Sequence, residues 1–69
     1  MTIKHFEAAA ELIRGMRASA AAMRRDLNDE TTARSLELRA DGAEDVFVSV
    51  ASEANPRFDS VRFRQACRA

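Results

Sequence analysis

The sequence predicts an all-α fold: an antiparallel two-helix hairpin followed by a short C-terminal third helix. Apolar residues recur at alternating steps of three and four in two long segments, as they do along the apolar seam of a helix. A short polar break at residues 28–31 separates the two segments, and Pro56 sets off the last part of the chain. At 69 residues, we expect one small helical domain spanning 1–69.

The first helix is predicted from about Ile3 to Leu27, with Thr2 as its N-cap. Gly15 lies off the apolar seam, so it weakens the helix without interrupting the seam. The seam consists of Phe6, Ala9, Ile13, Met16, Ala20, Met23 and Leu27.

The second segment fits two structures. Its heptad positions are Ala33, Leu36, Ala40, Ala43, Phe47, Val50 and Ala54, and Asp29 or Thr31 can cap the helix that they predict. The alternating residues of 36–38 and 46–50, on either side of Asp41-Gly42, fit a β-hairpin instead.

Cross-pairing favours the helix. If the two segments run antiparallel as helices, facing residues have numbers that sum to about 60. The pairs are then Arg24 with Glu37, Arg17 with Glu44, His5 with Glu53, Ala10 with Ala51 and Leu12 with Val46. Charge meets opposite charge and apolar meets apolar, which a β-hairpin does not explain. Gly42 leaves a helix start as late as Ala43 open.

A short third helix is predicted after Asn55 and Pro56, because the residue before proline is disfavoured in the α region. Asp59 is its expected N-cap, and Phe58 and Phe63 have the spacing of a hydrophobic staple. Its inner face would be Phe63, Ala66 and Cys67, and we expect this face to fold onto Leu12, Val46 or their neighbours.

Composition points to a thin core and a balanced surface. The hydrophobic fraction is 46%, but much of it is alanine and there is no Trp or Tyr, so we expect a third element or self-association to add buried area. The formal charge is zero, with five basic and two acidic residues in 1–25, three and nine in 26–59, and three and none in 60–69. This segregation indicates internal complementarity.

Nothing in the sequence predicts catalysis, a cofactor or a metal site. Glu7 and Glu11 are one helical turn apart, but a metal would need matching ligands and no E-x-x-H motif exists. Cys67 is the only cysteine, which excludes an intrachain disulfide, and we interpret it as a small buried hydrophobe. No apolar run approaches the about 18 residues of a membrane span, so we expect a cytoplasmic protein that does not enter membranes.

Two arginine clusters form the basis of a nucleic-acid hypothesis. They are Arg14, Arg17, Arg24 and Arg25 on the first helix, and Arg57, Arg62, Arg64 and Arg68 near the C-terminus. Such clusters contact phosphates, but the balanced total charge makes nucleic acid the less favoured partner.

A protein partner is favoured by apolar residues beyond those that one hairpin buries. The candidate partner surface is Leu38, Asp41, Asp45, Val48, Arg14 and Arg25. The same observation leaves a homodimer open.

The two termini resemble small, largely uncharacterised proteins of bacteriophages, especially those of actinobacteria. Residues 1–7 (MTIKHFE) are similar to their MT-x-KHFE start, and residues 55–67 (NPRFDSVRFRQAC) to their closing NP-x-FD-x-x-RF-x-x-AC pattern. Arg68 follows the cysteine here, where glycine is common in those proteins. The resemblance implies a phage origin and a helical fold but no activity.

These observations together favour a non-enzymatic phage accessory protein that binds a host or phage protein in the host cytoplasm. Inhibition of a host defence or nucleic-acid-processing complex is one such role. The alternatives are a small nucleic-acid-binding regulator that uses the arginine clusters, and a self-assembling structural module.

Overall fold

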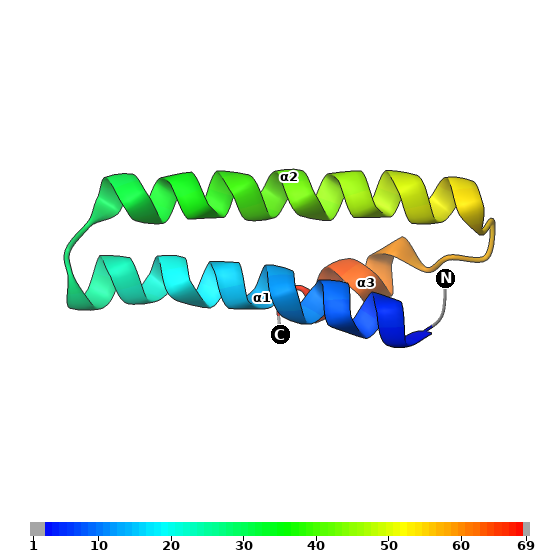
Figure 1. Ribbon diagram of the computed structural model, residues 1–69, viewed down its shortest axis with the longest axis horizontal. Helices are drawn as coiled ribbons and strands as arrows, with labels where there is room; N and C mark the ends of the chain where they lie inside the picture. Colours follow the sequence, from blue (N-terminus) through cyan, green and yellow to red (C-terminus); the bar gives the residue numbers. More distant parts are fainter. Residues whose placement is uncertain (1–2, 69) are drawn as a thin grey trace.

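Within residues 3–68 the chain folds into two long antiparallel helices and one short helix, as the computed structural model shows (Figure 1). The helices are α1 (Ile3–Asp26), α2 (Glu30–Ala54) and α3 (Ser60–Ala66). The structure describes residues 3–68, so the predicted Thr2 cap lies outside the described residues. These residues contain no strand, which confirms the helical hairpin and excludes the β-hairpin alternative for 36–50.

The turn between α1 and α2 is closed by backbone hydrogen bonds and by one side-chain cap. The carbonyl of Met23 accepts from the backbone N–H groups of Leu27 (3.2 Å) and Asp29 (3.0 Å). Asn28 has a φ of 53°, a left-handed conformation that asparagine tolerates better than most residues. Asp29 then accepts a hydrogen bond from the backbone N–H of Thr32 at 3.0 Å and caps α2. The helix therefore begins at Glu30, and not as late as Ala43.

The connection from α2 to α3 follows the sequence prediction. Asn55 is extended (φ −142°, ψ 103°), as expected before Pro56, and its side-chain oxygen accepts from the backbone N–H of Arg57. Asp59 caps α3 by accepting from the backbone N–H of Arg62 at 3.0 Å. The rings of Phe58 and Phe63 lie 5.8 Å apart, which confirms the hydrophobic staple.

The core is small and is built from alanines and a phenylalanine cluster. Its fully buried apolar residues are Ala10, Ile13, Ala20, Ala33, Ala40, Ala51, Phe63 and Cys67. Phe63 of α3 stacks on Phe47 of α2, with ring centroids 4.6 Å apart and an interplanar angle of 21°. Phe6 of α1 completes the cluster, with an edge contact to Phe47 and a tilted contact to Phe58. These rings bind all three helices together at one end of the hairpin.

The predicted seam of α2 is wrong in its second half. Ala43, Val50 and Ala54 are exposed, whereas Glu44 and Ala51 are buried. The buried set is therefore rotated by about one residue relative to the predicted seam, because α3 packs along that side of α2. Leu27, predicted as the last seam residue of α1, lies beyond the helix end and is also exposed.

The two residues named for the docking of α3 are wrong, although their sequence neighbours Ile13 and Phe47 do pack against Phe63. Leu12 and Val46, its expected contacts, are 69% and 64% exposed. Phe63 and Cys67 instead share a cluster with Ala10 and Ile13, against which Val48 also packs. The third helix therefore lies on the face of the hairpin opposite to Leu12 and Val46. The reason is the buried carboxylate of Glu44, which lies on this face.

Candidate functional site

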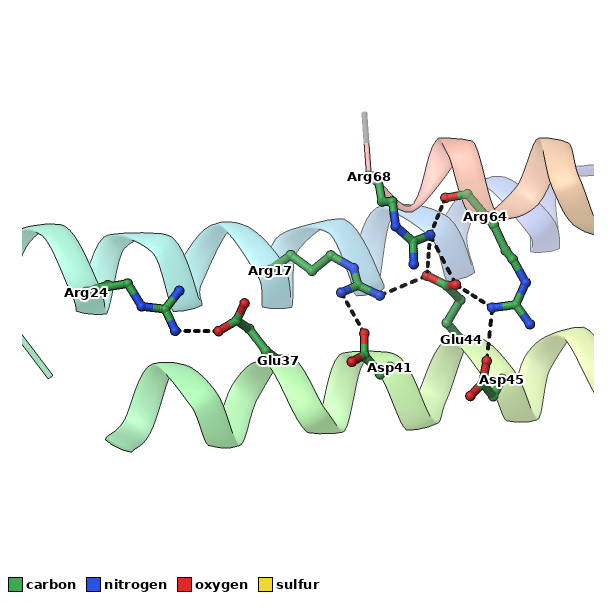
Figure 2. A network of polar contacts seen from close by, with 8 residues as sticks. All are labelled: Arg17, Arg24, Glu37, Asp41, Glu44, Asp45, Arg64 and Arg68. Atoms are coloured by element: carbon green, nitrogen blue, oxygen red, sulfur yellow. Dashed lines mark hydrogen bonds and ion pairs between the residues drawn. The ribbon is translucent and has the colours of Figure 1, made fainter. Parts of the chain in front are cut away.

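A buried carboxylate, Glu44 of α2, lies where the three helices meet. Only 1% of its surface is exposed, and guanidinium groups from two other segments surround it (Figure 2). Arg17 of α1 donates to it at 2.9 Å and Arg64 of α3 at 2.6 Å. Arg68, just after α3, donates to both of its oxygens at 3.1 Å. The Arg17–Glu44 pairing confirms a sequence prediction, and the arginines of the C-terminal segment add to it.

Glu44 is held in its ionised form by these contacts. Burial alone would raise the pKa of the Glu44 carboxyl, because it disfavours the charged state. Hydrogen bonds from Arg64, Arg17 and Arg68 outweigh burial and leave the pKa of this group below its ordinary value. A buried carboxylate with this many charge-assisted donors holds the helices together and stays ionised, so it does not have the proton that a general acid must donate.

The network continues outward along the hairpin (Figure 2). Arg17 also contacts Asp41 at 2.8 Å, and Arg64 contacts Asp45 at 2.9 Å. Arg24 contacts Glu37 at 2.5 Å, which confirms the second predicted charge pair. Arginines of both predicted clusters are thus used for internal ion pairs.

The C-terminal segment is tied down by further contacts around Cys67. Arg14 of α1 donates to the backbone carbonyl of Ala66 at 3.2 Å. The side chain of Cys67 is fully buried, as the sequence predicted. Burial, and then the nearby charge of Glu44, raise the pKa of the Cys67 thiol above its ordinary value. The thiol is therefore protonated at neutral pH and packs as an apolar group.

The fixed position of α3 forms one wall of a cavity of about 300 Å³ at the end of the hairpin. The opposite wall is the start of α1, and residues 55–59 close one end. The apolar part of its lining consists of Phe6, Ala10, Phe58, Phe63 and Ala66. A concave apolar surface with a few polar groups at its edge is typical of a binding pocket.

Two arginines in the cavity lining, Arg57 and Arg62, differ from those of the Glu44 network. Both are exposed, and neither guanidinium group forms an ion pair within residues 3–68. The carboxylate of Asp59, which also lines the cavity, accepts the backbone N–H of Arg62 as the cap of α3. The cavity therefore combines aromatic walls with two cations at its edge, and the exposed carboxylate of Glu7 also lies in its lining.

The predicted partner surface does not hold together as one patch. Leu38 is exposed, but Val48 is half-buried against the core, so its expected exposure is wrong. Asp41 and Asp45 have arginine partners, and Arg25 pairs with the adjacent Asp26. Arg14 is half-buried and bonded to α3.

The sequence reasoning missed the burial of Glu44 and the cavity next to α3. Arg64 and Arg68 are four residues apart and lie on one side of the C-terminal segment, a spacing that could have indicated a shared acidic partner.

Within residues 3–68, no group of three or more His, Cys, Asp or Glu side chains is placed to hold a metal ion. No helix in the same range is long and apolar enough to cross a membrane. Comparisons of this chain with protein-family models, with curated proteins and with solved structures find no match.

Proposed function

We propose that this chain is a non-enzymatic protein that binds another protein, and that its cavity receives an apolar side chain of that partner. The observation that supports the proposal is the pocket itself, in which Phe6, Phe58 and Phe63 lie beside two arginines that form no ion pair within residues 3–68. Interface hot spots commonly combine an apolar anchor in a pocket with charged groups around it. A volume of about 300 Å³ suits one large side chain.

The lining also defines the chemistry of the expected partner. A leucine, methionine or phenylalanine side chain of the partner would fill the space between the aromatic rings. A carboxylate next to that side chain would pair with Arg57 or Arg62. An acidic segment with one large apolar residue is therefore the favoured class of ligand. Such a segment would bury area against rings that are already fixed, which keeps the entropic cost of binding low.

The terminal motifs support the biological setting of this proposal. Their resemblance to phage-encoded proteins makes a host or phage protein in the host cytoplasm the expected partner. Inhibition of a host defence or nucleic-acid-processing complex is the narrower form of the proposal. An acidic surface can occupy the basic channel of such a complex, but Asp41 and Asp45 of the candidate partner surface are paired with arginines, which reduces the acidic surface available for that role.

Nucleic-acid binding has less support from the observed arginine contacts than it has from the sequence. Six of the eight arginines in the two predicted clusters have hydrogen-bond or ion-pair partners within the described chain, and only Arg57 and Arg62 are left for phosphates. Two phosphate contacts give weak binding, because the affinity for nucleic acid grows with the number of phosphates that a protein neutralises.

The proposal is tested by capture and by variants of the pocket. The tagged chain is incubated with actinobacterial lysate, captured proteins are identified by mass spectrometry, and the affinity of each for the purified chain is then measured by calorimetry. We expect Ala66→Leu, which fills the cavity, and the double variant Arg57→Glu/Arg62→Glu to weaken binding at least about tenfold. Arg34→Glu makes the same kind of charge change at an exposed position of α2 and should leave binding unchanged.

A captured protein whose affinity is the same for all these variants would contradict the role of the pocket. Tight binding to duplex DNA that weakens steeply as salt rises would favour the nucleic-acid alternative instead.

A further inference from the structure

The hairpin has two faces, and α3 covers only one of them. On the other face, Leu12, Val46 and Val50 are more than half exposed. Leu12, Met16 and Leu36 border one shallow groove, which places α1 and α2 residues on the same side. Monomeric proteins seldom leave large apolar residues gathered along one face.

The exposed side of α2 carries a charge order that is complementary to itself. Arg39, Val46 and Glu53 recur at steps of seven, so they form one line along the helix, next to the line of Leu36 and Val50. Arg39 and Glu53 are exposed, and neither forms an ion pair within residues 3–68. Arg39 and Glu53 therefore lie at equal distances along α2 on the two sides of Val46, one a cation and the other an anion.

We propose that this face binds a second copy of the chain, with the two α2 helices antiparallel across a twofold axis near Val46. The axis places Val46 against its own counterpart and Arg39 of each copy against Glu53 of the other. A twofold interface uses the same patch on both subunits, so one line of residues supplies both halves of each ion pair. The product is a bundle with four long helices.

The register between α1 and α2 shows which residues of α1 lie at the level of the proposed twofold axis. The observed pairs Arg17–Glu44 and Arg24–Glu37 have numbers that sum to 61, so Val46 lies level with Gly15. Around that level, Leu12 of the second copy meets the groove beside Gly15, which also has Met16 and Ser19 in its lining. Apart from its chain neighbours and the backbone of α1 itself, no atom of residues 3–68 lies within 4 Å of the position that a Cβ of Gly15 would take, so the groove has room for an inserted side chain.

A second copy fits this face better than an unrelated protein because the monomer itself supplies the complementary surface. It also supplies the buried area that the monomer lacks, since most of the fully buried apolar residues are alanines. This interface and the cavity beside α3 are separate surfaces, so the inference does not depend on the proposed function.

Sedimentation equilibrium over a wide concentration range tests the dimer. We expect the mass to approach twice that of the 7.7 kDa chain. Val46→Glu should weaken the association at least about tenfold. Leu38→Glu is the matched control, because Leu38 is 63% exposed on the same helix but lies on another side, and it should leave the dimer intact. A wild-type chain that stays monomeric, or equal effects of the two variants, would overturn the proposal.

Charge reversal tests the antiparallel register. Arg39→Glu and Glu53→Arg should each weaken self-association, because each creates like-charge pairs. A mixture of the two single variants should form a one-to-one heterodimer, because all the pairs between the copies are then opposite in charge. Circular dichroism checks that each variant is folded. Failure of the folded variants to associate when mixed would refute the register and leave the pocket proposal unaffected.

Discussion

Arg64 Nη1 lies 2.6 Å from Oε2 of Glu44, and this contact joins the last helix to a carboxylate buried in the hairpin. The same carboxylate accepts from Arg17 of α1, so a single side chain links all three helices. Short, charge-assisted contacts in a water-poor site depend on one another, because the loss of one leaves the remaining charges uncompensated.

Glu44→Gln should therefore lower the free energy of unfolding by about 3 kcal/mol. The substitution keeps the shape of the side chain but leaves Arg17, Arg64 and Arg68 without their shared counter-charge. Urea denaturation followed by circular dichroism measures the effect. Asp45→Asn removes an exposed partner of Arg64 and should cost less than about 1 kcal/mol. Equal costs for the two variants would show that the network adds nothing beyond surface pairing.

The stability of the protein should fall in acid because of the same group. The pKa of Glu44 in the folded state is lower than its ordinary value of about 4.5. Its contribution is therefore complete above that ordinary value and is lost as the pH falls through the lower, folded-state pKa. Urea midpoints measured from pH 7 to strongly acidic conditions should decline less steeply in Glu44→Gln. Parallel curves for the two proteins would contradict this assignment.

Cys67 should resist thiol reagents at neutral pH, because it is fully buried and its pKa is raised. Asp59→Ala removes the cap of α3, and we expect faster modification of the thiol because the helix frays from the hairpin. The rate of reaction with Ellman's reagent measures it. Asp29→Ala removes the cap of α2 at the other end of the molecule and is the control for general destabilisation. Similar rates for the two cap variants would argue against local opening.

Gly42→Ala should stabilise the protein by about 0.5 to 1 kcal/mol. Gly42 lies inside α2, and apart from its chain neighbours and the backbone of α2 itself no atom of residues 3–68 comes within 4 Å of the position that a Cβ would take. Ser52→Gly, at another exposed position of α2, should shift stability the opposite way. Thermal unfolding at low protein concentration separates these local effects from association. A lower melting temperature for Gly42→Ala would mean that the flexibility of glycine is needed there.

The helices and their ends were predictable because their signals are local. Asp59 needs only the backbone N–H of Arg62, three residues later, to begin α3, and the restriction before Pro56 is enough to end α2. The pairing of Arg17 with Glu44 was also accessible, since two antiparallel helices have a simple register.

The face on which α3 docks was not predictable from apolar spacing. Leu12 and Val46 were the larger apolar pair, whereas the true face carries the charged Glu44. Charged residues are normally expected to be exposed. The burial of Glu44 is favourable here only because arginines of α1 and of the C-terminal segment surround its carboxylate. Apolar periodicity contains no information about such a convergence. The cavity was missed for the same reason, since its walls come from α1, α3 and the residues between α2 and α3.

The place of Glu44 on one flank of α2 also decides the handedness of the whole bundle. A third helix can follow a hairpin on either side, which gives two topologies that are close to mirror images. The buried charge of Glu44 on one flank, with counter-charges on α1 and on the C-terminal segment, favours the arrangement in which α3 packs on that flank.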